Sequence, residues 1–233
     1  MNQENPNGWP LTLTRNLEDF PVANRPLRDW LATASALLKE KISNCVYPWD
    51  LLAINEWVVG GLCENEITGE FHASAVIEGF LKLGAGSKIL PGVFIEGNVV
   101  IGENCKIGPN CHIRGNTSIG NGCHIGQSVE VKNSIILDRT CVGHLSYVGD
   151  SILGEGVNFG AGTMVSNLRH DGGNHRSKVG DEWVDTGRRK LGVLVGDHVH
   201  TGIGTLIYPG RKIWPHATTR PGEVVKKDLM VRS

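Results

Sequence analysis

A histidine and a tyrosine stand out in the segment GHLSYVGD, residues 143–150, within a chain built largely from aliphatic residues, glycine and small polar residues. His144 could serve as a general base, because imidazole exchanges a proton readily near neutral pH. Two cations, Arg114 and Lys132, precede it and are 18 residues apart. Paired cations can bind a phosphate through charge-assisted hydrogen bonds. A structural histidine in a turn and two solvated surface cations are the alternatives that these residues leave open.

A six-residue repeat surrounds these side chains. Every sixth residue is aliphatic over eleven consecutive positions: Ile77, Leu83, Ile89, Ile95, Ile101, Ile107, Ile113, Ile119, Ile125, Val131 and Leu137. The rhythm returns at Val195, Thr201, Ile207, Ile213, Thr219 and Val225. A helix has a period of about 3.6 residues and a strand a period of about 2, so neither explains it. A six-residue repeat predicts a parallel β-helix.

The pattern resembles the hexapeptide-repeat, left-handed β-helix family, in which three hexads form one triangular coil. Residues 18 apart then stack on one face, about 4.8 Å apart. Arg114 should therefore stack on Lys132, an unfavourable pairing of like charges unless an anion compensates it. Continuing the phase through Asp138 places His144 two faces beyond Lys132. The two could then meet only across an interface between subunits.

The chain divides into three parts. Residues 26–42 and 47–62 have apolar spacings of three and four and are predicted to be two helices. We expect a helical cap or linker over residues 1–65, the β-helix over 66–226 and a tail over 227–233. Residues 168–190 break the period and indicate an excursion loop. The second helix resembles the segment that joins a nucleotidylyltransferase domain to a β-helix, and that preceding catalytic domain is expected to be absent.

The composition excludes some classes of partner and indicates the state of the cysteines. With 23 Lys and Arg against 24 Asp and Glu, the charge is nearly balanced, so neither nucleic acid nor a membrane is an expected partner. The N-terminus carries no export signal, and a cytoplasmic location is expected. Of the six cysteines, Cys105, Cys111 and Cys123 fall on a buried phase of the repeat. We therefore predict small buried thiols rather than disulfides, with no metal expected.

Residues 129–168 resemble the acetyltransferase half of bifunctional sugar-1-phosphate nucleotidylyltransferase/acetyltransferases, especially the archaeal ones. The resemblance implies a homotrimer that N-acetylates an amino-sugar phosphate, of the glucosamine-1-phosphate or galactosamine-1-phosphate type, with acetyl-CoA as co-substrate. It implies a general base at His144 and an acetyl-CoA contact at Ala161. It implies sugar and phosphate contacts at Arg114, Lys132, Tyr147, Asn158, Asn167 and Arg176. No covalent intermediate is needed, so none of the cysteines is expected to be a nucleophile.

The chain departs from this family in two places. In the excursion loop the family has substrate-binding lysines, whereas this chain has Gly173 and Arg176. The loop also carries the basic run Arg188, Arg189 and Lys190, which either contacts a phosphate of CoA or is solvated. Near the coenzyme, Ile203 and Pro221 replace the family's serine and alanine. These changes leave the identity of the substrate open.

Two other functions compete with acetyl transfer. Carbonic anhydrases of this fold bind zinc with three histidines, two of them five residues apart, and His170 and His175 have that spacing. The surrounding motif does not match, and both residues lie in the excursion loop. The other alternative is a catalytically inactive trimer that serves as a scaffold or binds a sugar nucleotide.

Overall fold

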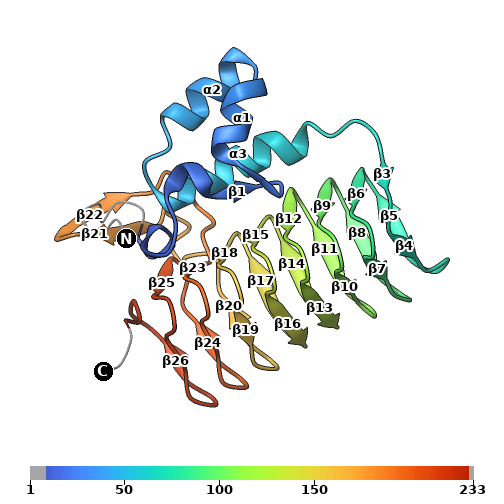
Figure 1. Ribbon diagram of the computed structural model, residues 1–233. Coiled ribbons are helices and arrows are strands. Elements are labelled where there is room, and N and C mark those ends of the chain that lie inside the picture. The colour runs from blue at the N-terminus through green and yellow to red at the C-terminus, as the bar shows by residue number, and fades with distance from the viewer. Residues whose placement is uncertain (1–8, 231–233) are drawn as a thin grey trace.

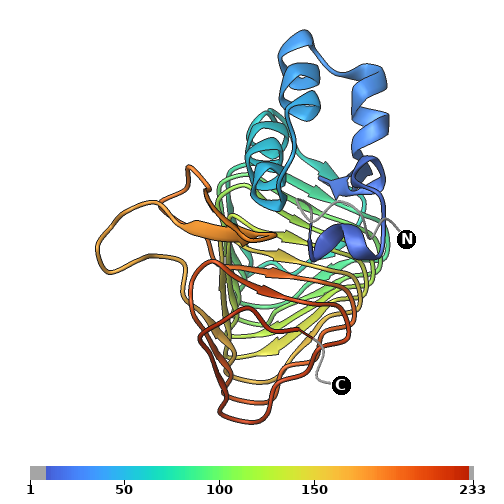
Figure 2. The ribbon, with the colours of Figure 1, turned by 90° about the vertical axis from the view of Figure 1, so that its left-hand side faces the viewer.

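The computed structural model describes residues 9–230 as a three-sided parallel β-helix with a small helical unit on one side (Figures 1 and 2). Successive strands visit three sheets in turn, and strands from neighbouring coils pair in parallel within each sheet. The predicted left-handed parallel β-helix is confirmed. No helix within residues 9–230 is long and apolar enough to cross a membrane.

We name the three sheets the first, second and third faces, in the order in which the chain reaches them. The first face holds eight strands: β3 (Glu66–Ile67), β6 (Leu81–Leu83), β9 (Val99–Ile101), β12 (Thr117–Ile119), β15 (Ile135–Ile136), β18 (Ile152–Leu153), β23 (Val193–Val195) and β25 (Arg211–Ile213). The second face holds six: β4 (Glu70–Phe71), β7 (Lys88–Ile89), β10 (Lys106–Ile107), β13 (His124–Gln127), β16 (Cys141–His144) and β19 (Asn158–Phe159). The third face holds eight: β5 (Val76–Glu78), β8 (Phe94–Glu96), β11 (His112–Arg114), β14 (Glu130–Lys132), β17 (Tyr147–Gly149), β20 (Met164–Val165), β24 (Leu206–Ile207) and β26 (Val224–Val225).

Columns of aliphatic side chains fill the inside of the β-helix. On the third face Ile95, Ile113 and Val131 stack in register, and none of them has any exposed surface. Each buried aliphatic side chain of this kind contributes about 2 kcal/mol relative to an exposed one. The later positions of the repeat, such as Val195 and Ile213, line the same core. The repeat in the sequence is therefore the interior of the fold.

The rhythm loses one residue at the corner between the third and first faces. Ile119 pairs with Ile136, and Ile136 pairs with Leu153, so each of these two coils has 17 residues rather than 18. Ile136 takes the interior place that we predicted for Leu137. Leu137 turns outward and packs beneath the helices instead.

This shortening also changes the predicted phase of His144. Val142 lies in the interior, Gly143 follows it, and His144 is one residue further along and pairs with Gln127. The expectation that His144 continues the phase of Lys132 was therefore wrong by one residue. Its assignment to a different face from Lys132 is unaffected, because β16 belongs to the second face and β14 to the third.

The N-terminal segment forms three helices instead of the predicted two: α1 (Leu27–Thr33), α2 (Ala36–Ser43) and α3 (Pro48–Gly60). The predicted first helix breaks because Ala34 and Ser35 are extended, and the Ser35 hydroxyl accepts a hydrogen bond from the Leu38 amide as an N-cap. Two 3-10 turns (Leu11–Leu13 and Leu17–Asp19) and a short antiparallel pair, β1 (Pro21–Val22) and β2 (Arg25–Pro26), precede them.

The helical unit covers part of the first face. Leu51 and Leu52 of α3 belong to one buried cluster with Ile135, Leu137 and Ile152, which point outward from the β-helix. In Figure 1 the three helices lie along one side of the coils. The molecule therefore has two cores that share the wall of the first face.

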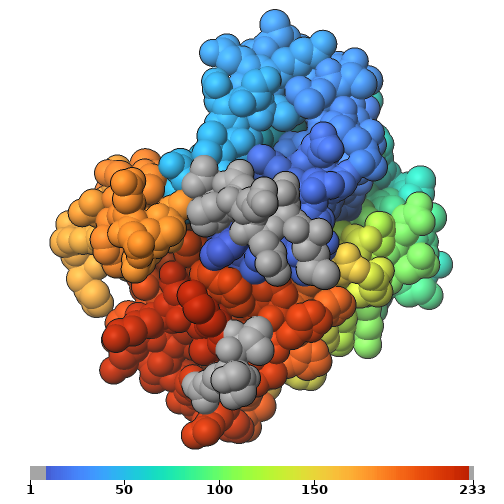
Figure 3. Space-filling model, turned by 60° about the vertical axis from the view of Figure 1, so that its left-hand side comes forward, coloured from blue at the N-terminus to red at the C-terminus, as the bar shows by residue number. Residues whose placement is uncertain are grey.

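The excursion between β20 and β23 contains an antiparallel hairpin, β21 (Arg176–Val179) and β22 (Glu182–Asp185). It projects from the side of the β-helix (Figures 2 and 3). Val179 and Val184 pack against the cluster beneath the helices. The buried ammonium of Lys212 donates to the Lys178 carbonyl oxygen. The hairpin is thus fixed to the body by contacts along its length.

Candidate functional site

The two cations stack as predicted, and each already has an anionic partner in the chain. Arg114 on β11 pairs in register with Lys132 on β14. The Arg114 guanidinium lies 2.7 Å from Glu130 Oε1, and the Lys132 ammonium lies 2.9 Å from Asp150 Oδ2. The repulsion between like charges is thus offset within the chain, by carboxylates that we did not predict.

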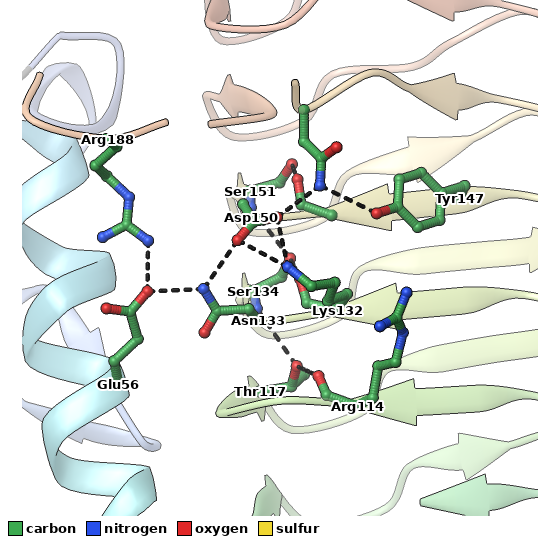
Figure 4. Close-up of polar contacts among 12 residues, drawn as sticks. Glu56, Arg114, Thr117, Lys132, Asn133, Ser134, Tyr147, Asp150, Ser151 and Arg188 are labelled. Carbon is green, nitrogen blue, oxygen red and sulfur yellow. Dashed lines mark hydrogen bonds and ion pairs between the residues drawn. The ribbon is translucent and has the colours of Figure 1, made fainter. Parts of the chain in front are cut away.

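Asp150 is the centre of a polar network (Figure 4). Its carboxylate is almost fully buried and accepts hydrogen bonds from Lys132 Nζ, from Asn133 Nδ2 at 3.0 Å and from Asn167 Nδ2 at 2.6 Å. Asn167 Nδ2 also donates to the Tyr147 hydroxyl at 3.0 Å. Three of the predicted substrate-binding residues, Lys132, Tyr147 and Asn167, are therefore brought together around one carboxylate.

A glycine makes room for the tyrosine and the asparagine. A methyl group added at Gly149 would lie 2.4 Å from the Tyr147 hydroxyl oxygen and 2.7 Å from Asn167 Nδ2, well inside van der Waals contact. Burial raises the pKa of the Tyr147 hydroxyl, and the charge of Asp150 raises it further. Tyr147 is therefore a neutral phenol that can donate a proton in a hydrogen bond.

The network extends to the helical unit and to the excursion loop. Asn133 Nδ2 donates to Glu56 Oε1 of α3 at 2.7 Å, and the same oxygen accepts from the Arg188 guanidinium (Figure 4). Arg188 is largely buried. It therefore anchors the loop to α3, and the alternative of a free cation for a coenzyme phosphate does not hold for this residue.

His144, Asn158 and Ala161 lie elsewhere. His144 ends β16 on the second face, and its carbonyl oxygen accepts from the Gly162 amide at 3.1 Å. Its exposed side chain forms no hydrogen bond or ion pair within residues 9–230. Asn158 begins β19 on the same face, and Ala161 is in the following turn. His144 and Ala161 lie at the corner between the second and third faces, whereas Asn158 aligns with Cys141 on the second face; none of them joins the network around Asp150.

The remaining basic residue of the predicted set joins neither group. Arg176 begins β21, is exposed, and donates to the Trp183 carbonyl oxygen across the hairpin. Its position gives it a structural partner within the hairpin.

The two histidines considered as zinc ligands, His170 and His175, lie in different environments. His175 is buried, its ring lies 3.1 Å from the Asn167 carbonyl oxygen, and burial lowers the pKa of its imidazole. His170 is exposed on the loop. Within residues 9–230 no three histidine, cysteine or acidic side chains are arranged to hold a metal ion.

The cysteine prediction is confirmed for the three residues of the repeat. Cys105, Cys111 and Cys123 are each at most 2% exposed, and all six cysteines are free thiols. Burial raises the pKa of the Cys111 thiol to about 11. Cys111 is therefore a packing residue.

Sequence reasoning missed four residues of the site: Asp150, Glu130, Asn133 and Glu56. One signal was available for Asp150, since it follows Lys132 by 18 residues, the spacing of one regular coil. The coil is one residue shorter here and aligns Lys132 with Gly149, so Asp150 lies one residue beyond the aligned position and still contacts the lysine. Nothing in the sequence pointed to Glu56, which lies 77 residues before its partner Asn133.

The fold and the stacked polar side chains define a hexapeptide-repeat β-helix protein, and comparison places it in a family. Residues 95–225 match the family model described as the GMPPB C-terminal domain, and the chain belongs to that family. It is 41% identical over 182 residues to the bifunctional sugar-1-phosphate nucleotidylyltransferase/acetyltransferase of Sulfurisphaera tokodaii, covering 78% of this chain and 45% of that protein. It is 36% identical over 182 residues to the bifunctional protein GlmU of Methanocaldococcus jannaschii, covering 78% of this chain and 44% of that protein.

The chain therefore spans about half the length of these curated relatives. Among solved structures, it is similar to the UDP-N-acetylglucosamine O-acyltransferase LpxA of Moraxella catarrhalis, with 14% identity, a TM-score of 0.38 and coverage of 66% of both chains. These values are too low to carry a functional argument. The resemblance to the acetyltransferase half of the bifunctional enzymes is confirmed by the curated relatives.

Proposed function

We propose that this chain transfers the acetyl group of acetyl-CoA to the amine of an amino-sugar phosphate. The observation that carries the proposal is the stack of Arg114 on Lys132 with Tyr147 and Asn167 held beside Lys132. Two cations suit a phosphate, and a phenol with an amide suits the hydroxyl groups of a sugar. The name of the Sulfurisphaera relative, which includes sugar-1-phosphate and acetyltransferase, is consistent with this chemistry.

In this proposal His144 removes a proton from the sugar amine as its nitrogen attacks the thioester carbonyl carbon. Attack forms a C–N bond and a tetrahedral oxyanion, which backbone N–H groups stabilise. Collapse of the oxyanion breaks the C–S bond, and the leaving thiolate of CoA takes up the proton from the His144 imidazolium. Asn158 contributes to sugar binding, and Ala161 lies against the coenzyme. Arg176 would reach the substrate only from a partner subunit or after movement of the hairpin.

We further propose that the active protein is a homotrimer. In one chain His144 and Lys132 lie on different faces, which supports a site shared between two subunits. The outer surface of the third face carries an in-register apolar column formed by Met164, Leu206 and Val224, each 39–45% exposed. Exposed apolar columns of this kind favour contact between subunits. Sedimentation equilibrium should give a mass of three times 25.2 kDa.

One observation favours a second candidate, a non-catalytic trimer that serves as a scaffold. Both cations are already neutralised, Arg114 by Glu130 and Lys132 by Asp150. A phosphate must share or displace these carboxylates, which weakens binding. In this case the protein would fold and assemble without turning over any amino-sugar phosphate.

The test is thiol release from acetyl-CoA with glucosamine 1-phosphate and with galactosamine 1-phosphate, for the wild type and His144→Ala. Turnover with one sugar that is lost in the variant supports acetyl transfer and identifies the substrate. A folded trimer that releases no thiol with either sugar contradicts the proposal and favours the scaffold. A zinc-dependent lyase would instead show carbon dioxide hydration that a chelator abolishes.

A further inference from the structure

The network around Asp150 carries a further inference, which rests on the proposed function. A carboxylate offers only acceptors, so the group of Asn167 that faces Asp150 at 2.6 Å must be its NH₂. The same nitrogen faces the Tyr147 hydroxyl oxygen. Both N–H donors of Asn167 are thus used inside the protein, and its Oδ1 is left as the group for a ligand.

Tyr147 is fixed in the same way. Its oxygen accepts from Asn167, so its own O–H is available as a donor. The ammonium of Lys132 contacts both Asp150 oxygens, at 2.9 and 3.1 Å, and has three N–H groups to share. At least one of them can face an anion.

We infer that Asp150 is a positioning residue that sets the hydrogen-bonding polarity of the site. It positions the Lys132 ammonium and orients the Asn167 amide, so that Asn167 Oδ1 is left as an acceptor. Through Asn167 it also leaves the Tyr147 O–H as a donor. The ligand it selects carries an anionic group for Lys132, an acceptor oxygen for Tyr147 and an O–H or N–H group for Asn167. An amino sugar that carries a phosphate meets all three requirements.

The backbone around Asp150 holds its carboxylate in place. It stands at the shortened corner with φ of 50°, a left-handed conformation that Asp and Asn tolerate better than other side chains. Its amide donates to the Lys132 carbonyl oxygen at 2.8 Å, and its carbonyl oxygen accepts from the Gly192 amide at 2.9 Å. The backbone therefore fixes the carboxylate between the two coils.

The variant to test is Asp150→Asn, which keeps the shape but allows the facing amide groups to rotate. Its matched control is Asp197→Asn, because Asp197 is also a buried corner carboxylate, 2.5 Å from Arg15. Crystal structures of both variants are the first measurement. In Asp150→Asn the Lys132 ammonium and the Asn167 side chain should leave their wild-type positions, and in Asp197→Asn they should stay. Unchanged positions in Asp150→Asn overturn the inference.

Steady-state kinetics give the second measurement. Asp150→Asn should raise the KM for the amino-sugar phosphate by about tenfold or more, since a charged hydrogen-bond acceptor is lost. In this variant the KM for acetyl-CoA should stay within about twofold of the wild-type value. In Asp197→Asn the KM values for both substrates should do so. Equal changes in the two variants would reduce Asp150 to a structural role and overturn the inference. If the wild type releases no thiol, the proposed function fails, and the crystal structures still decide the role of Asp150.

Discussion

The network around Asp150 and the corner that carries His144 are built in opposite ways. Around Asp150, every polar side chain that we assign to the substrate is bonded to another side chain of the same protein. At His144 the side chain is exposed and has no hydrogen-bonding partner within residues 9–230. The first region is organised before any ligand arrives, which lowers the entropic cost of binding. In the proposed function, the second region is completed by a second subunit and its substrate.

The largest expected effect is on catalysis at the open corner. His144→Ala should lower kcat for acetyl transfer by about 100-fold or more, the usual contribution of a general base. The thermal midpoint should hardly move, because the side chain has no partner to lose. Thiol release and thermal unfolding measure the two quantities. His72→Ala, at an exposed histidine of an early coil, serves as the control. A His144→Ala variant with the wild-type kcat would contradict the role of His144 as the general base.

The next effect is a difference in unfolding free energy between variants of the two cations. Lys132→Ala leaves the Asp150 carboxylate, whose side chain is 3% exposed, without its ammonium partner and should cost about 3 kcal/mol of unfolding free energy. Arg114→Ala breaks a pair in which both side chains are about a third exposed and should cost less than about 1 kcal/mol. Urea denaturation of both variants gives the comparison. Equal losses would mean that Asp150 does not organise the network.

A smaller effect is expected from steric crowding inside the network. Gly149→Ala places a methyl group against Tyr147 and Asn167, and should destabilise the fold by about 1–3 kcal/mol and weaken sugar binding. Gly143→Ala is the matched variant, since its added methyl meets nothing closer than Cys141 Sγ at 3.8 Å. Urea denaturation should show a clear loss for Gly149→Ala alone. If Gly149→Ala is as stable as the wild type, Tyr147 and Asn167 can move to accommodate the methyl group, and the prediction is wrong.

The smallest effect concerns pH at the base of the hairpin. Burial lowers the pKa of His175, and Arg169 and Arg211 lower it further, so the folded protein favours the neutral imidazole. The contribution of His175 to the free energy of unfolding is therefore full above pH 6.5, the ordinary pKa of a histidine, and decreases as the pH falls below that value. Limited proteolysis should therefore cut within 176–185 faster at pH about 5.5 than at about 7.5. In His175→Gln the rate should depend less on pH; an unchanged pH dependence would contradict this role.

The sequence by itself determined the β-helix and the stack of Arg114 on Lys132. An aliphatic residue at every sixth position has one structural explanation, and residues 18 apart must then align as long as each coil keeps three hexads. The prediction failed at Leu137, which follows Ile135 and Ile136. Three successive aliphatic residues allow two phases, and the sequence alone cannot say which of them points inward. The helices on the first face decide it, because they bury Ile135 and Leu137 on the outside.

Only the tertiary structure decided how the site is held together. Asp150 and Asn133 face each other because the 17-residue coil aligns them, and Glu56 reaches Asn133 from a helix far away in sequence. No local pattern encodes contacts of this kind, since each depends on how separate elements pack. The same packing leaves His144 on another face, open to solvent. Periodic burial is encoded residue by residue, whereas the polar network exists only after the helices, the coils and the excursion loop have come together.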